Sequence, residues 1–149
     1  MKKLFTSFKL VSALLVFSTI LFAFTNKFES PVSFLIVASV NANVNTGTFT
    51  STGFAMSSGV LVEEYSFNGK KTHSEVTFTD VAGSVTAKTH TDVILTSAST
   101  ATGTGTWIII RGSGAYVGVK GSGTLTFNVT DISTPTENIL EQWVGSIKR

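Results

Sequence analysis

The sequence predicts an all-β protein, an antiparallel up-and-down barrel of about eight strands. Three observations support this fold class. Apolar and polar residues alternate in short runs, most clearly in residues 122–130, where Leu125, Phe127 and Val129 share one face. Turn-forming residues such as Asn68-Gly69 separate the runs at fairly regular spacing. The runs between residues 43 and 136 have no convincing helical period, so hairpin connections and an antiparallel sheet are expected.

The first 42 residues are interpreted as an export segment rather than as part of the barrel. A basic start precedes the uncharged apolar run Leu10–Phe24, which is shorter than the about 20 apolar residues of a spanning helix. A second apolar run, Val32–Val40, leads to Ala42, with valine two positions before it. This pattern suits a signal peptidase, so cleavage is predicted after Ala42. The alternative is an uncleaved N-terminal membrane anchor through residues 10–24.

The predicted domains are therefore a signal peptide or anchor at 1–42 and a β-barrel at 43–149, exported to the periplasm or the medium. Within the barrel, strands are expected at residues 46–54, 60–67, 72–81, 84–96, 104–111 and 122–130. Asn68-Gly69 predicts a type I′ hairpin turn, because both central positions of that turn need a positive φ. The tail, 137–149, has an apolar spacing that fits an amphipathic helix, and a closing strand followed by a short helix is the alternative.

Composition excludes several classes of function. The formal net charge is +2, but four of the eleven Lys and Arg residues lie in the first 42 positions. Residues 43–149 contain seven basic and eight acidic residues, which gives a formal net charge of −1. A nearly neutral body argues against nucleic-acid binding, which needs a basic stripe. The absence of cysteine excludes disulfides, thiolate catalysis and cysteine-based metal sites.

The glycine-rich stretch GSGAYVGVKGSG, residues 112–123, invites comparison with a nucleotide-binding loop. Such a loop needs G-x-G-x-x-G between a strand and a helix, yet Val117 stands at the third glycine position and no helix follows. We expect a structural role instead: the glycines allow close backbone approach at the barrel rim, and Ala115-Tyr116 covers the barrel end.

Both histidines of the chain lie on predicted strands, next to acidic residues. His73 and Glu75 share one face of their predicted strand, and His90 and Asp92 share one face of theirs. Both faces lie opposite the apolar residues. They are therefore expected to point to solvent, and a metal or acid–base site is the alternative if the lumen is polar. The sequence predicts no metal, no cofactor and no catalytic residue, since it also lacks a G-x-S-x-G nucleophile motif.

A third set of residues is predicted to line a ligand cavity: Glu63, Tyr65, Trp107, Arg111 and Tyr116. Ligand cavities combine apolar walls with a few convergent polar groups, and alternation places Trp107 and Arg111 on one face of their strand. The alternative is that Trp107 belongs to a packed core and that Arg111 is a rim residue paired with a carboxylate.

Residues 103–125 resemble a motif of small exported bacterial proteins that are similar to the allene oxide cyclase and dirigent barrels. The matching positions are Gly105, Trp107, Gly112, Ser113, Gly114, Ala115, Tyr116, Gly118, Val119, Gly121 and Gly123. The resemblance implies a calycin-like antiparallel barrel, which is often oligomeric in the plant members. No catalytic residue of the plant cyclases maps onto this chain.

These observations predict an exported β-barrel that serves as a binding or structural module, with a small hydrophobic molecule as its ligand. One alternative is an isomerase or cyclase that acts on a small hydrophobic substrate in the barrel cavity. Another is a surface protein that associates with copies of itself as a homo-oligomer. No nucleic-acid partner is expected, and membrane contact is expected only through the N-terminal segment.

Overall fold

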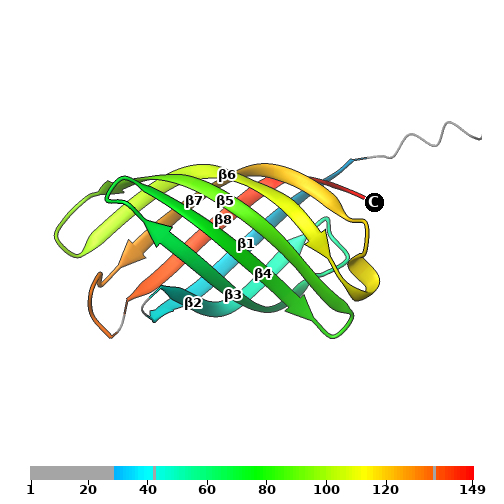
Figure 1. The fold of residues 1–149 in the computed structure, drawn as a ribbon, viewed down its shortest axis with the longest axis horizontal. Coiled ribbons are helices and arrows are strands. Elements are labelled where there is room, and N and C mark those ends of the chain that lie inside the picture. Colours follow the sequence, from blue (N-terminus) through cyan, green and yellow to red (C-terminus); the bar gives the residue numbers. More distant parts are fainter. Residues whose placement is uncertain (1–28, 42, 136) are drawn as a thin grey trace, which may run out of the picture.

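The protein forms a closed barrel of eight antiparallel strands (Figure 1). The computed structural model describes residues 29–41, 43–135 and 137–149. The strands are β1 (Ser30–Asn41), β2 (Val44–Thr52), β3 (Ser58–Phe67), β4 (Lys71–Asp80), β5 (Gly83–Leu95), β6 (Thr100–Gly112), β7 (Lys120–Thr130) and β8 (Asn138–Lys148). Each strand pairs with the next along the chain, and β1 pairs with β8 to close the barrel. The predicted fold class is confirmed.

Strand alternation divides the side chains between lumen and solvent as the sequence predicts. On β7, Leu125, Phe127 and Val129 are buried, whereas Thr124 and Thr126 are exposed. The turn that contains Asn68-Gly69 joins β3 to β4, so the predicted hairpin is confirmed. The predicted type I′ geometry is wrong, because Gly69 has a φ of 88° but Asn68 does not have a positive φ. The loop instead covers residues 68–70, where Asn68 Oδ1 accepts hydrogen bonds from the Lys70 and Lys71 amides. Hairpin turns therefore fix the register of neighbouring strands, as expected for an up-and-down barrel.

The barrel begins earlier in the chain than the sequence suggested. Residues 30–41, interpreted above as the end of an export segment, form β1, which pairs with both β2 and β8. The predicted domain boundary between residues 42 and 43 is therefore corrected. The strand was missed because Leu35 and Val37 are apolar but face outward, which hides the alternation with the buried Phe34 and Ile36. The apolar run 10–24 lies outside the described residues.

The tail is the closing strand rather than an amphipathic helix. In β8, Ile139, Trp143 and Ile147 point into the barrel, and Leu140 and Val144 remain exposed. Apolar residues on both faces of a strand imitate the spacing of a helix, which explains the ambiguity in the sequence. Among the described residues, no helix has the length and hydrophobicity that a membrane span needs.

The lumen is filled by aromatic side chains in its middle part. Phe34, Phe49, Phe78, Trp107 and Trp143 form one cluster, with ring centroids 5.0 Å apart for Phe49–Phe78 and 5.7 Å apart for the two tryptophans. Such spacings are typical of favourable aromatic pairs. The cluster separates the two ends of the barrel, so the two ends can differ in side-chain composition and packing.

One end of the barrel is closed by the glycine-rich stretch. A single 3₁₀ turn, η1 (Gly114–Tyr116), carries the Tyr116 side chain into a buried position 5.5 Å from the Phe54 ring. The Tyr116 hydroxyl donates a hydrogen bond to Asp80, and burial together with that carboxylate raises the pKa of Tyr116 to about 12. A Cβ on Gly112 would lie 2.1 Å from the Tyr116 carbonyl oxygen. The expected structural role of this stretch is confirmed.

Candidate functional site

The opposite end of the barrel contains a cavity of about 560 Å³. This volume lies in the range of about 300–1,000 Å³ that small-molecule sites occupy. Its residues come from β1 to β8 and from the loop between β7 and β8: Val40, Asn45, Glu63, Tyr65, Phe67, Thr72, Thr89, Thr91, Val93, Leu95, Ala101, Leu125, Phe127, Val129, Ile132, Ser133, Thr134, Glu137, Ile139 and Glu141. Exposed Phe67 and Leu95 mark the outer part, and the buried residues lie deeper.

Buried polar side chains mark the inner part of the cavity. Asn45 is 2% exposed, and Glu63 and Glu141 are each 6% exposed. The Asn45 Nδ2 group donates to Glu63 Oε2 at 2.8 Å, and the Trp143 Nε1 group donates to Glu141 Oε2 at 2.6 Å. Buried acids are rare unless they are paired, so their presence in a cavity is a candidate functional feature.

Glu141 is held in its protonated form at neutral pH. Burial disfavours its charged form, and the negative charge of Glu63 adds to this effect, so the pKa of Glu141 rises to about 8 although the Trp143 hydrogen bond opposes the shift. Burial also raises the pKa of Tyr65 in the same cavity, with added contributions from the charges of Glu137 and Glu63. The inner cavity is therefore an environment that resists further negative charge.

Two buried polar atoms of the cavity wall have no hydrogen-bond partner among the described residues. They are Asn45 Oδ1 and Thr91 Oγ1, which belong to β2 and β5. Buried polar atoms are normally paired, because leaving one unpaired costs about 1–3 kcal/mol. A group that enters the cavity and bonds to these atoms would remove that cost.

The predicted cavity residues do not all come together. Glu63 and Tyr65, on β3, line the cavity. Trp107 lies in the aromatic core, and Tyr116 closes the other end of the barrel. Arg111 lies outside the barrel, where its guanidinium bonds to Glu75 at 3.2 Å. The alternative interpretation of Trp107 as core and Arg111 as a surface ion pair therefore describes the structure.

A β-bulge explains the position of Arg111. Thr86 pairs with Arg111 and Ala87 with Ile109, so Ile110 is an extra residue on β6. One inserted residue reverses the side-chain alternation that follows it. Arg111 therefore points outward, where its Nε donates to Thr86 Oγ1 at 3.1 Å, instead of sharing the inner face with Trp107.

Trp107 fits the core because two glycines face it. Gly123 on β7 pairs with Gly145 on β8, and a Cβ on either one would lie within 2.8 Å of the Trp107 indole. The indole Nε1 donates to the Thr124 carbonyl oxygen at 3.1 Å and to that of Val144 at 3.3 Å. The Trp107 side chain is therefore packed in the core and does not line the cavity.

Asn45 and Glu141 are functional candidates that the sequence pattern did not predict. Asn45 precedes the first strand expected there, and Glu141 lies in the tail that resembled a helix. The available signal was the alternation of Ile139, Glu141 and Trp143, which predicts three inward residues if the tail is a strand. Glu141 would then have joined Glu63 as a candidate.

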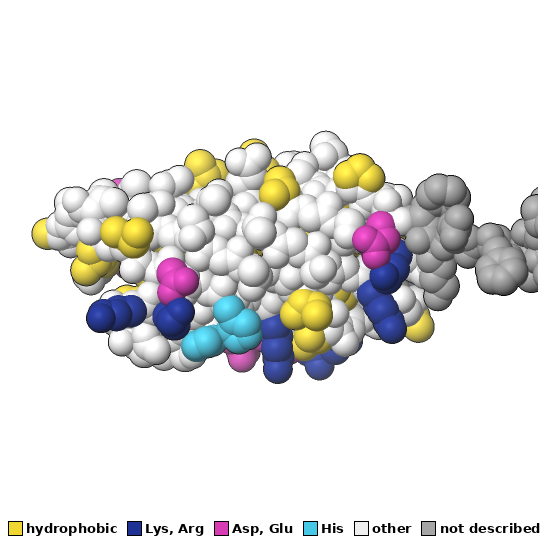
Figure 2. Space-filling view, turned by 90° about the horizontal axis from the view of Figure 1, so that it is seen from above, with side chains coloured by type: hydrophobic (Ala, Val, Ile, Leu, Met, Phe, Trp, Pro, Cys, Tyr) yellow, Lys and Arg dark blue, Asp and Glu magenta, His cyan; other side chains and the backbone are white. Residues whose placement is uncertain are grey.

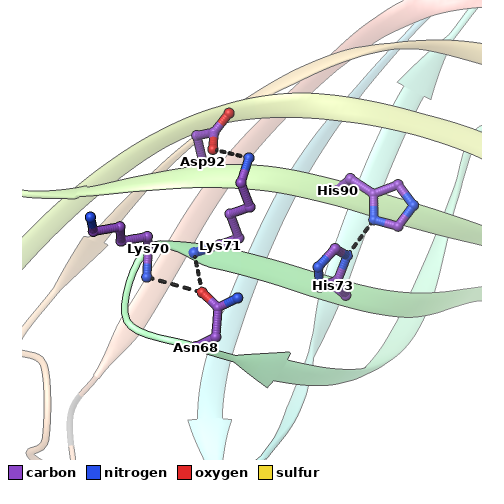
Figure 3. A network of polar contacts seen from close by, with 6 residues as sticks. All are labelled: Asn68, Lys70, Lys71, His73, His90 and Asp92. Atoms are coloured by element: carbon purple, nitrogen blue, oxygen red, sulfur yellow. Dashed lines mark hydrogen bonds and ion pairs between the residues drawn. The ribbon is translucent and has the colours of Figure 1, made fainter.

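The two histidines lie on the outer surface, as predicted. His73 and His90 are a cross-strand pair on β4 and β5 with facing rings (Figure 3), and Figure 2 shows both beside charged side chains. Nearby, Lys71 and Asp92 form an exposed ion pair of 2.6 Å, and Asn68 Oδ1 accepts bonds from the turn backbone. Within the described part of the chain, no group of three or more His, Cys, Asp or Glu residues could hold a metal ion.

Comparisons with known proteins add little beyond the fold. No family model and no curated protein matches the chain. Among solved structures, a pyocyanin demethylase matches 78% of this chain and 99% of its own, with 19% identity and a TM-score of 0.38. A likeness of this size carries no information about function. The closed antiparallel barrel agrees with the barrel part of the resemblance described above, and the relation to allene oxide cyclase and dirigent proteins remains a prediction.

Proposed function

We propose that this protein binds a small, largely apolar molecule inside its barrel. The observation that carries the proposal is the cavity of about 560 Å³, which has apolar walls and ends at Asn45, Glu63 and Glu141. Ligand sites have this composition, with a few placed polar groups that orient the ligand within an apolar pocket. A purely structural barrel gains nothing from buried carboxyls and unpaired polar atoms, which reduce stability.

Binding of N-phenyl-1-naphthylamine, a neutral apolar dye that fluoresces more strongly out of water, tests this proposal. The unsubstituted protein is expected to bind it saturably with a stoichiometry near one. The cavity-filling variant Ala101→Phe is expected to weaken binding by about tenfold or more, because Ala101 is buried in the cavity wall on β6. Thr104→Phe, on the exposed face of the same strand, is the control. Equal binding by both variants would place the dye elsewhere and contradict the proposal.

An isomerase or cyclase that acts on a small hydrophobic substrate in the barrel cavity is the second candidate, in the form of an enzyme that catalyses proton transfer. The observation in its favour is the pair of buried carboxyl groups, because Glu141 retains a proton at neutral pH whereas Glu63 contributes a negative charge. A carboxylic acid and a carboxylate in an apolar cavity are the groups that general acid–base catalysis needs. In this mechanism, Glu63 removes a proton from carbon while Glu141 donates one to a carbonyl oxygen. In the second step, Glu63 returns a proton to carbon and Glu141 takes a proton back from the oxygen.

Deuterium exchange at the α-carbon of 2-tetralone, a small apolar ketone, tests the second candidate by NMR. The unsubstituted protein is expected to accelerate exchange over buffer, and Glu63→Gln is expected to slow it by about a hundredfold or more, because an amide cannot act as the base. Glu64→Gln, exposed on the same strand, should exchange at the unsubstituted rate. If 2-tetralone binds and exchanges only at the rate of buffer, the protein is a binding module and not an isomerase of this kind.

A further inference from the structure

The inner cavity offers hydrogen-bond acceptors and lacks positive charge. The described residues that line it include three glutamates, Glu63, Glu137 and Glu141, and no lysine, arginine or histidine. The basic side chains lie elsewhere: Lys71, Lys148 and Arg111, for example, form ion pairs on the outer surface. The negative charge of the buried Glu63 therefore has no cationic partner among the residues that line the cavity.

The hydrogen bonds already present leave acceptors unused. Asn45 donates a hydrogen bond to Glu63 through Nδ2. The other amide atom, Asn45 Oδ1, has no hydrogen-bond partner among the described residues. Oδ1 can only accept. The Thr91 hydroxyl, in a side chain 7% exposed, is likewise unpartnered and lines the same cavity from β5. The Thr91 hydroxyl can accept or donate, whereas Asn45 Oδ1 only accepts, so a ligand that satisfies Asn45 Oδ1 must supply a donor.

We propose that the cavity selects an apolar molecule with a protonated amine, whose nitrogen binds against Glu63 and Asn45. This inference rests on the proposed binding function and names its ligand class. An ammonium group has three N–H donors and a positive charge, so it can bond to Asn45 Oδ1 and offset the charge of Glu63 at once. A neutral alcohol supplies a single donor and no charge. A carboxylate adds a second negative charge beside Glu63.

Three naphthalene probes of matched size test the proposal: 1-naphthylmethylamine, 1-naphthylmethanol and 1-naphthoate. Titration calorimetry at neutral pH is expected to show that the amine binds about tenfold more tightly than the alcohol, because charge-assisted hydrogen bonds are the stronger ones. The carboxylate is expected to bind most weakly. Equal binding of amine and alcohol would overturn the inference and leave the binding function standing. Absence of binding by all three probes would count against the binding function itself.

The variant Glu63→Gln separates the charge from the shape of the site. It is expected to reduce amine affinity to the level of the alcohol and to leave alcohol affinity within about twofold, because the amide oxygen can still accept from Asn45. Glu64→Gln is the matched control, since its side chain is exposed on the same strand. An unchanged preference for the amine in Glu63→Gln would overturn the role of Glu63. The ranking of the three probes in the unsubstituted protein decides the proposal even if this variant does not fold.

Discussion

A chain that begins at Asn43 is expected not to form the barrel, whereas a chain of residues 29–149 is expected to fold. Strand β1 pairs with β2 from Ser33 to Asn41 and with β8 from Ser30 to Ser39. Its removal opens the barrel and leaves two long strand edges unpaired, which promotes aggregation. It also removes buried Val32, Phe34, Ile36 and Ala38. At about 1.5–3 kcal/mol for each large apolar side chain, this loss is comparable with the about 5–15 kcal/mol that stabilises a typical domain.

Circular dichroism during heating and two-dimensional NMR of the two chains measure this effect. The longer chain should melt cooperatively and give dispersed amide signals, and the shorter one should do neither. Two point variants of the full chain isolate the contribution of the core. Phe34→Ala, at a side chain 4% exposed, is expected to cost about 3–5 kcal/mol, and Leu35→Ala, at one 49% exposed, should cost far less. A cooperative transition at the same temperature for both chains would show that β1 is dispensable.

Replacing Glu141 by Gln is expected to remove most of the pH dependence of the free energy of unfolding between pH 4.5 and about 8. The carboxyl has its ordinary pKa of 4.5 when unfolded and about 8 in the folded barrel. Between these values the folded state keeps a proton that the unfolded state has lost. The stabilisation that Glu141 contributes is therefore largest below pH 4.5 and is lost as pH rises toward 8. At about 1.4 kcal/mol per pH unit, the total loss is on the order of 5 kcal/mol.

Urea unfolding at several pH values tests this prediction. Glu141→Gln stays neutral throughout, and its amide oxygen can accept the hydrogen bond from Trp143 Nε1 that Glu141 accepts now. The variant should therefore become more stable than the unsubstituted protein as pH rises toward 8. Glu64→Gln, with an exposed side chain, should keep the original pH profile. Parallel profiles for Glu141→Gln and the unsubstituted protein would mean that Glu141 is not protonated in the barrel.

Much of the fold follows from local patterns that the sequence displays directly. Period-two alternation identifies the strands from β3 to β7 and places His73 and His90 on the solvent side, because successive side chains of a strand point to opposite faces. Asn68-Gly69 identifies a hairpin, and the glycines around Tyr116 identify a covered barrel end. These features depend on neighbours along the chain, so the sequence alone contains them.

The site depends on contacts between distant parts of the chain, and only the tertiary structure decides those. Closure of β1 against β8 brings Asn45, Glu63 and Glu141 into one cavity although they lie on β2, β3 and β8. A single bulged residue at Ile110 turns Arg111 out of the lumen, and an alternation pattern does not reveal where such a residue is inserted. The sequence by itself determined an alternating, turn-connected sheet. Barrel closure decided which acids are buried together, because burial and charge proximity arise only when all eight strands are in place.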